Sequence, residues 1–134
     1  MPTRDDLESY LIRLGVDYEE IEDGLWVLRS TDGLAVVVQS SPPVVVLRLK
    51  VLSIPEEADS ARQLALYRRL LELNATELVH GSYGIEERDV VLTDALDLET
   101  LDFEEFRSSY ESLIFAATSH LPGLAELILV AHEG

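Results

Sequence analysis

Hydrophobic positions near the start of the chain recur at helical spacing, which predicts a first helix. Asp5 and Asp6 suit the positive end of a helix dipole, Thr3 can cap the start, and Gly15 supplies the stop. The residues that share one face of this helix are Leu7, Tyr10, Leu11 and Leu14.

Runs rich in Val, Leu and Trp follow, and they predict strands at about 25–30, 34–40 and 44–53. Short turn sequences containing Gly, Asp or Pro separate these runs, which favours antiparallel pairing. In the third strand Arg48 and Lys50 point to one side, which should reach water. The opposite side should be buried; it carries Val45, Leu47, Leu49 and Val51.

A second helix is predicted over residues 58–73. Leu66 and Leu73 lie to the side of its main apolar stripe, so the helix is apolar on more than one face. The stripe itself includes Ala61, Leu64, Ala65, Tyr67, Leu70 and Leu71.

Two more strands are predicted at about 77–83 and 88–94, followed by a long helix that starts near Asp102. The sequence His-Leu-Pro-Gly at 120–123 predicts a break in that helix. The segment after the break is expected to form a short helix, although its pattern also allows a strand. The apolar side of the long helix carries Phe103, Phe106, Tyr110, Leu113, Ile114 and Ala117.

The predicted order is therefore α-β-β-β-α-β-β-α plus a short C-terminal helix. It indicates an α+β fold, with a five-stranded antiparallel sheet and packed helices, in a single domain over residues 1–134. Two or three helices can cover one face of such a sheet but hardly both. We therefore expect another chain to hide some of the remaining apolar surface.

The net charge of the chain disfavours anionic partners. The chain has 134 residues and a formal net charge of −16, with 26 acidic and 10 basic residues. Such a field repels nucleic acid and anionic membrane surfaces. The start of the sequence has no pattern of a signal peptide, and no cysteine is present, so we expect a cytoplasmic protein without disulfides.

No pattern in the sequence indicates catalysis. His80, His120 and His132 lie too far apart in the sequence for a helical metal motif, and structural or surface roles are expected for them. The acidic stretch 93–105 lacks the glycine of a calcium loop. Trp26, the only tryptophan, is expected to be a half-buried core residue, or a binding anchor if exposed. The sequence predicts no metal, no cofactor and no enzyme.

The chain resembles the bacterial YbjN-like family and its relatives, the class I type III secretion chaperones. Three segments carry the resemblance: LESYLIRLGVDYEEIEDGLWVL, VVVQSSPPVVVLRLKV and LYRRLLELNATELVHGSYGIEERDVVLTDAL, within residues 7–117. The resemblance implies a non-enzymatic module, usually a homodimer, that holds a segment of another protein against apolar patches.

Our first hypothesis is a dimeric chaperone-like or adaptor protein with an unknown protein partner. The partner-binding patch is predicted at Leu7, Leu11, Trp26 and Leu28. The dimer interface is predicted either on the second helix or on a late strand, at Leu66, Leu70 and Leu73 or at Val90 and Leu92. The alternative is a regulatory or sensory domain that binds a small molecule, and an enzyme that uses carboxylates alone ranks third.

Overall fold

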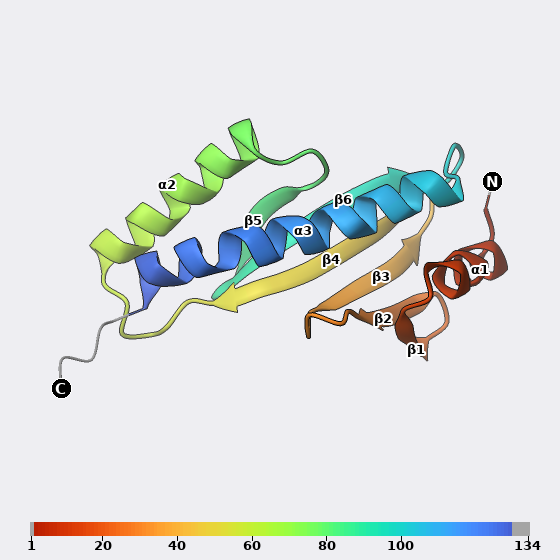
Figure 1. The fold of residues 1–134 in the computed structure, drawn as a ribbon, viewed down its shortest axis with the longest axis horizontal. Helices are drawn as coiled ribbons and strands as arrows, with labels where there is room; N and C mark the ends of the chain where they lie inside the picture. Colours follow the sequence, from red (N-terminus) through yellow and green to blue (C-terminus); the bar gives the residue numbers. More distant parts are fainter. Residues whose placement is uncertain (1, 130–134) are drawn as a thin grey trace.

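The computed structural model describes residues 2–129 as three helices and a six-stranded sheet (Figure 1). The predicted α+β class is confirmed. The elements in chain order are α1 (Arg4–Leu14), β1 (Asp17–Glu22), β2 (Leu25–Arg29), β3 (Ala35–Ser41), β4 (Val44–Ser53), α2 (Ser60–Thr76), β5 (Ser82–Glu86), β6 (Asp89–Asp97) and α3 (Phe103–Ile128).

The sheet is antiparallel throughout, with the strand order β1-β2-β3-β4-β6-β5. The long strand β4 pairs with β3 on one side, where Leu47 faces Val38, and with β6 on the other, where Leu49 faces Leu92. Paired residues share a side of the sheet, so these pairings extend rows of apolar side chains across several strands.

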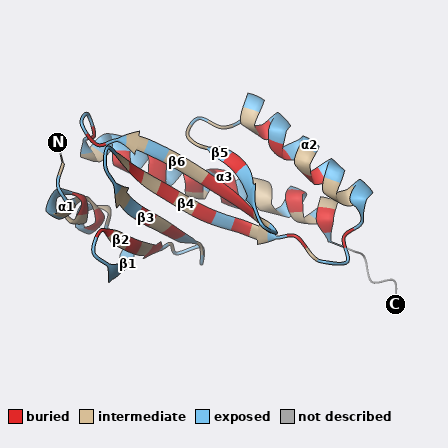
Figure 2. Cartoon of the chain, turned by 180° about the vertical axis from the view of Figure 1, so that it is seen from behind, coloured by how far each residue is buried: buried red, intermediate tan, exposed pale blue. Residues whose placement is uncertain are grey.

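The three helices pack on one face of this sheet. α3 lies along β4 and β6, α2 lies beside α3 next to β5, and α1 lies at the other end of the molecule near β1 (Figure 1). From behind, the strands lie in front of α3 (Figure 2). Buried side chains from α1, α2 and α3 join those of one sheet face in a single hydrophobic core.

Each helix begins at a capping residue that the sequence supplies. The Thr3 side chain accepts a hydrogen bond from the backbone N–H of Asp6, and the Asp6 carboxylate accepts one from Thr3, which lowers the pKa of Asp6. Asp59 and Asp102 cap α2 and α3 in the same manner. Gly15 ends α1 at φ +72°, so the predicted limits of this helix are confirmed.

The helix-free face of the sheet is part apolar and part charged. Val37 and Val46 lie half-buried near its middle. Lys50 is exposed, as predicted, and its Nζ lies 3.6 Å from the Asp89 carboxylate. Arg48 is partly exposed on the same face. The described chain therefore leaves apolar surface on this face that its own helices do not cover.

The sheet has one more strand than the sequence predicted. The added strand is β1, whose residues Asp17–Glu22 are mostly acidic. Acidic residues have low strand propensity, and this edge strand forms because β2 pairs with it. β5 starts at Ser82, not at 77, because the preceding residues form the connection from α2 and include Gly81 at φ +74°.

The predicted helix break at 120–123 is wrong, because α3 continues to Ile128 with Pro122 inside it. A proline within a helix costs about 3 kcal/mol, since it removes one hydrogen bond and crowds the previous turn. Leu124 and Ile128, each 1% exposed, pack into the core beyond the proline. Burial of such side chains contributes about 1.5–3 kcal/mol each and offsets that cost. The expected C-terminal helix is thus the last part of α3, and His132 lies outside the described residues.

Candidate functional site beside α3

The residues predicted to bind a partner lie in the core. Leu7, Leu11, Trp26 and Leu28 belong to the same buried cluster, and each is 0% exposed. The Arg4 guanidinium also covers the Trp26 ring, 5.9 Å from its centroid. A partner could touch these side chains only if α1 moved away from the sheet. Their partner-binding role stays a prediction, and accessible binding surface lies elsewhere.

The predicted dimer residues are in the same core, and each is at most 4% exposed; they are Leu66, Leu70, Leu73, Val90 and Leu92. α2 turns its other side outward, where Leu64 is 69% and Leu71 is 68% exposed. The sequence stripe placed these two leucines on the main apolar side, and that placement is wrong. Leucines surround the helix, so its packing against α3 and β5 decides which of them are covered.

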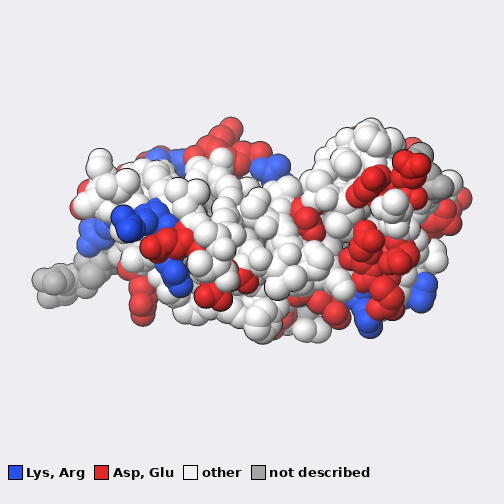
Figure 3. Space-filling view, turned by 90° about the horizontal axis from the view of Figure 1, so that it is seen from above, with Lys and Arg blue, Asp and Glu red and all other residues white. Residues whose placement is uncertain are grey.

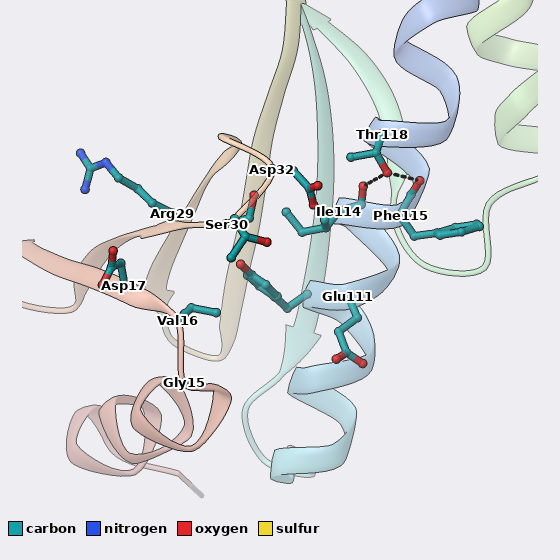
Figure 4. A pocket seen from close by; sticks show the side chains of 12 residues that line it. Gly15, Val16, Asp17, Arg29, Ser30, Asp32, Glu111, Ile114, Phe115 and Thr118 are labelled. Atoms are coloured by element: carbon teal, nitrogen blue, oxygen red, sulfur yellow. Dashed lines mark hydrogen bonds between the residues drawn. The ribbon is translucent and has the colours of Figure 1, made fainter.

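A first groove of about 700 Å³ lies between α3 and two connections near α1. Its outer wall comes from the α1–β1 junction and the β2–β3 turn, and its inner wall comes from α3 (Figure 4). The lining residues are Gly15, Val16, Asp17, Arg29, Ser30, Thr31, Asp32, Tyr110, Glu111, Ile114, Phe115 and Thr118.

Two of the four hydroxyl groups that line this groove, those of Ser30 and Thr118, have hydrogen bonds within the chain. The Ser30 hydroxyl accepts from the backbone N–H of Leu34 at 3.1 Å. The Thr118 hydroxyl donates to the carbonyl oxygen of Ile114, 3.0 Å away (Figure 4). Tyr110 is 5% exposed, and its hydroxyl has no hydrogen-bond partner among residues 2–129. This hydroxyl is therefore a polar group available to a ligand.

Charges surround that hydroxyl. Burial raises the pKa of Tyr110, and the carboxylates of Asp32 and Glu111 raise it further. Arg29 is the basic residue of the lining, but it extends away from α3 (Figure 4), and its Nη1 lies 3.8 Å from Glu19. The groove thus presents negative charge and a protonated phenol.

A second groove of about 840 Å³ lies on the other side of α3, against the end of α2 and the connection to β5. Within it, the Nδ1 atom of His120 lies 2.7 Å from the Tyr83 hydroxyl, and burial lowers the pKa of His120. His80 lies 3.9 Å from the Asp94 carboxylate, which also accepts a hydrogen bond from Ser109. Both described histidines therefore have structural partners, as expected.

Phe115 is the residue that joins the two grooves. Its side chain is 73% exposed and lines both of them. In Figure 4 it points to the side of α3 away from the β2–β3 turn. Sequence reasoning missed it, although a signal was present: Phe115 is two positions from Leu113, about 200° around the helix, so it lies opposite the buried stripe.

The surface charge is uneven along the molecule. Figure 3 shows carboxylates gathered at the end of the molecule that holds α1 and the start of α3. More of the visible basic side chains lie at the α2 end, and uncharged surface lies between the two ends. Among residues 2–129 no group of three His, Asp or Glu side chains is placed to hold a metal ion. No helix in the same range is long and apolar enough to cross a membrane.

Several solved structures share this fold, among them complexes of the type III secretion system. A chain of the ExoU–SpcU complex from Pseudomonas aeruginosa superimposes with a TM-score of 0.68 at 14% identity, over 87% of this chain and 95% of that one. A chain of the HopA1–SchA chaperone–effector complex gives 0.65 at 12% identity, over 87% and 90%. E. coli YbjN gives 0.70 at 15% identity, over 98% and 97%. At these identities the likeness shows the fold alone.

The family is shown by a sequence model. The chain belongs to the CesT_Tir_1 family, whose model matches residues 2–130. It is a family of non-enzymatic chaperones, so the expectations of this fold and of no enzyme are confirmed. No curated protein sequence matches the chain.

Proposed function

We propose that this chain is a chaperone-like or adaptor protein that holds a segment of another protein against apolar patches, and that it acts as a cytoplasmic homodimer. Phe115 carries the proposal. An aromatic ring that is 73% exposed between two grooves has the size and position of an interface anchor. The HopA1–SchA chaperone–effector complex, which contains a chain of the same fold, supports a protein as the ligand.

The partner segment is expected to lie along α3, in place of the buried patch predicted from the sequence. The two grooves flank this helix, and both offer apolar side chains beside polar ones, with Ile114 in the first and Val79, 84% exposed, in the second. This mixture of an apolar centre and a polar rim is typical of protein interfaces.

Photo-crosslinking tests the partner-binding proposal. A benzophenone amino acid replaces Phe115, and a matched protein carries it at Glu99, an exposed position outside both grooves. After irradiation in the cells that produce the protein, we expect one dominant adduct from position 115, identified by mass spectrometry and absent from position 99. Equal adducts at the two positions, or none at 115, would refute the proposal.

The outer side of α2 is our proposed dimer interface. Leu64 and Leu71 flank the exposed Arg68, and Ala61 and Ala75 extend the row at alternating spacings of three and four residues. Such spacing forms the contact line of paired helices. Arg68 lies 3.6 Å from Glu72 of the same helix, so its charge is partly balanced. A second copy would therefore cover the leucines that this chain leaves exposed.

The magnitude of this contact follows from the two leucines. About two thirds of each side chain is exposed, so covering it contributes about 1–2 kcal/mol, or about 4–8 kcal/mol for the four in a dimer. Replacing Leu64 and Leu71 by Ser should weaken the dimer by at least about 100-fold.

Light scattering at micromolar concentration measures this effect. The wild type should show twice the chain mass of 15.0 kDa, and the double variant should show the monomer mass. The control is Ile12→Ser, which changes a residue that is 64% exposed on α1. A monomeric wild type, or a double variant that still dimerises, would overturn the proposed interface.

A further inference from the structure

The charged groups that face the first groove are negative. Carboxylates of Asp17, Asp32 and Glu111 line it, whereas Arg29 extends away from α3 and lies 3.8 Å from Glu19 (Figure 4). The whole chain carries a formal charge of −16, so distant residues do not cancel this local field. A cation is attracted to this groove, and an anionic segment is repelled.

The Tyr110 hydroxyl is a second and independent indication of a ligand. Tyr110 is 5% exposed and lines the groove. Its hydroxyl lacks a hydrogen-bond partner among residues 2–129. Within that range, Trp26 Nε1 is the one fully enclosed side-chain atom without a partner, so the Tyr110 oxygen is reached through the groove. Unpaired polar groups at buried positions are costly, and a ligand that hydrogen-bonds to this oxygen would be favoured.

Apolar surface lies directly beside these polar groups. Ile114 follows Tyr110 by one helical turn and is half-buried, and Phe115 next to it is 73% exposed. Val16 adds an apolar side chain to the lining from the α1–β1 junction. The groove therefore offers one polar, negatively charged compartment and one apolar compartment to the same ligand.

We infer that this groove binds a partner segment in which an arginine or lysine is next to an apolar side chain. The basic group donates hydrogen bonds to the Tyr110 hydroxyl oxygen and to the carboxylates of Asp32 and Glu111. The apolar neighbour covers Ile114 and Phe115. The inference rests on the proposed function and adds the chemistry of the bound segment.

Selection from random 12-residue peptides displayed on phage tests the inference with the full chain. We expect the peptides enriched on the wild type to contain Arg or Lys next to an aliphatic or aromatic residue. The same selection on the Asp32→Asn/Glu111→Gln variant should lose this preference. Both positions are exposed, so the variant should fold, and circular dichroism is the measurement that checks this.

The most enriched peptide, made synthetically, gives the magnitude by fluorescence anisotropy. Asp32→Asn/Glu111→Gln should weaken its binding about fivefold to thirtyfold, and Tyr110→Phe about threefold to tenfold. The matched control is Glu56→Gln/Glu57→Gln, which removes two exposed carboxylates outside the groove and should change binding less than twofold.

The outcomes separate the inference from the proposed function. Enriched peptides without a basic residue, or equal weakening by the groove and control variants, would overturn the inference and leave a peptide-binding protein. Failure to enrich any peptide on the wild type would overturn the inference and would count against the proposed function as well, which the crosslinks from position 115 test separately.

Discussion

Gly81 is the residue whose replacement should disturb the fold most for the smallest chemical change. It lies in the connection between α2 and β5 at φ +74°, where a side chain is disfavoured. A Cβ atom added there would lie 2.8 Å from the Thr93 carbonyl oxygen and 3.1 Å from Leu113 Cδ2. The first neighbour is backbone of β6 and the second is core, so neither can move freely.

The expected cost has two parts. The left-handed backbone conformation costs a residue other than glycine about 1–2 kcal/mol. The close contacts add overpacking of about 1–3 kcal/mol. Gly81→Ala should therefore lower the free energy of unfolding by about 2–5 kcal/mol. Gly33 is the matched control, because its φ is +82° and a Cβ atom there meets nothing within 4 Å. Gly33→Ala should lose only the first part.

Urea unfolding followed by tryptophan fluorescence measures the difference. Trp26 is the only tryptophan and is 0% exposed when folded, so its emission reports on the core. With a slope of about 1.5 kcal/mol per molar urea, the two midpoints should differ by about 0.7–2 M. Asn tolerates left-handed backbone, so Gly33→Asn should be nearly neutral while Gly81→Asn stays destabilised. If Gly81→Ala were no worse than Gly33→Ala, the contact argument would be refuted.

Three further predictions concern polar side chains within the helices or at a helix cap. Asn74→Ala should lower the free energy of unfolding in urea by about 1–3 kcal/mol. The Asn74 side chain accepts a hydrogen bond from the Tyr83 N–H at 2.7 Å and donates one to the Tyr83 carbonyl oxygen at 3.2 Å. A variant as stable as the wild type would contradict this. Asp102→Ala should lower the free energy of unfolding by about 1 kcal/mol by removing the cap on the Glu105 N–H at 2.8 Å, and Asp102→Asn, the control, should restore most of it. Burial lowers the pKa of His120, so below about pH 6.5 the unfolded chain binds a proton that the folded chain excludes, and the free energy of unfolding falls. His120→Gln should reduce this loss of stability between pH 7 and 5. Equal dependence of stability on pH in the variant and the wild type would refute the prediction.

The parts of the fold that the sequence predicts are those that local chemistry decides. The limits of α1 follow from Thr3 and Gly15, and the alternation in β4 follows from its period of two. The sequence did not predict strand β1, because its acidic residues form a strand only through pairing with β2. Pro122 predicts a helix end on local grounds, and burial of residues beyond it reverses that outcome. Tertiary contacts decide these cases, and no single segment contains them.

The candidate site was harder to predict for the same reason. The sequence pattern of α2 does not distinguish which of its leucines are buried. The positions of α3 and β5 decide this, and they bury Leu66 and leave Leu64 exposed. The first groove combines Asp32 from a turn with Tyr110 from α3, residues far apart in the sequence. Phe115 alone carried a local signal, since it is an aromatic residue opposite the apolar side of its helix.

The positions of the exposed apolar residues also bear on whether dimerisation and partner binding can coexist. The first groove is lined by α3 and by residues 15–17 and 29–32, and it contains no residue of α2. The second groove includes Arg69 and Leu73, so a copy seated on α2 would lie at its edge. Dimerisation through Leu64 and Leu71 would therefore leave the first groove open and narrow access to the second. Of the two, the first groove is the one that a dimer could offer to a client on each protomer.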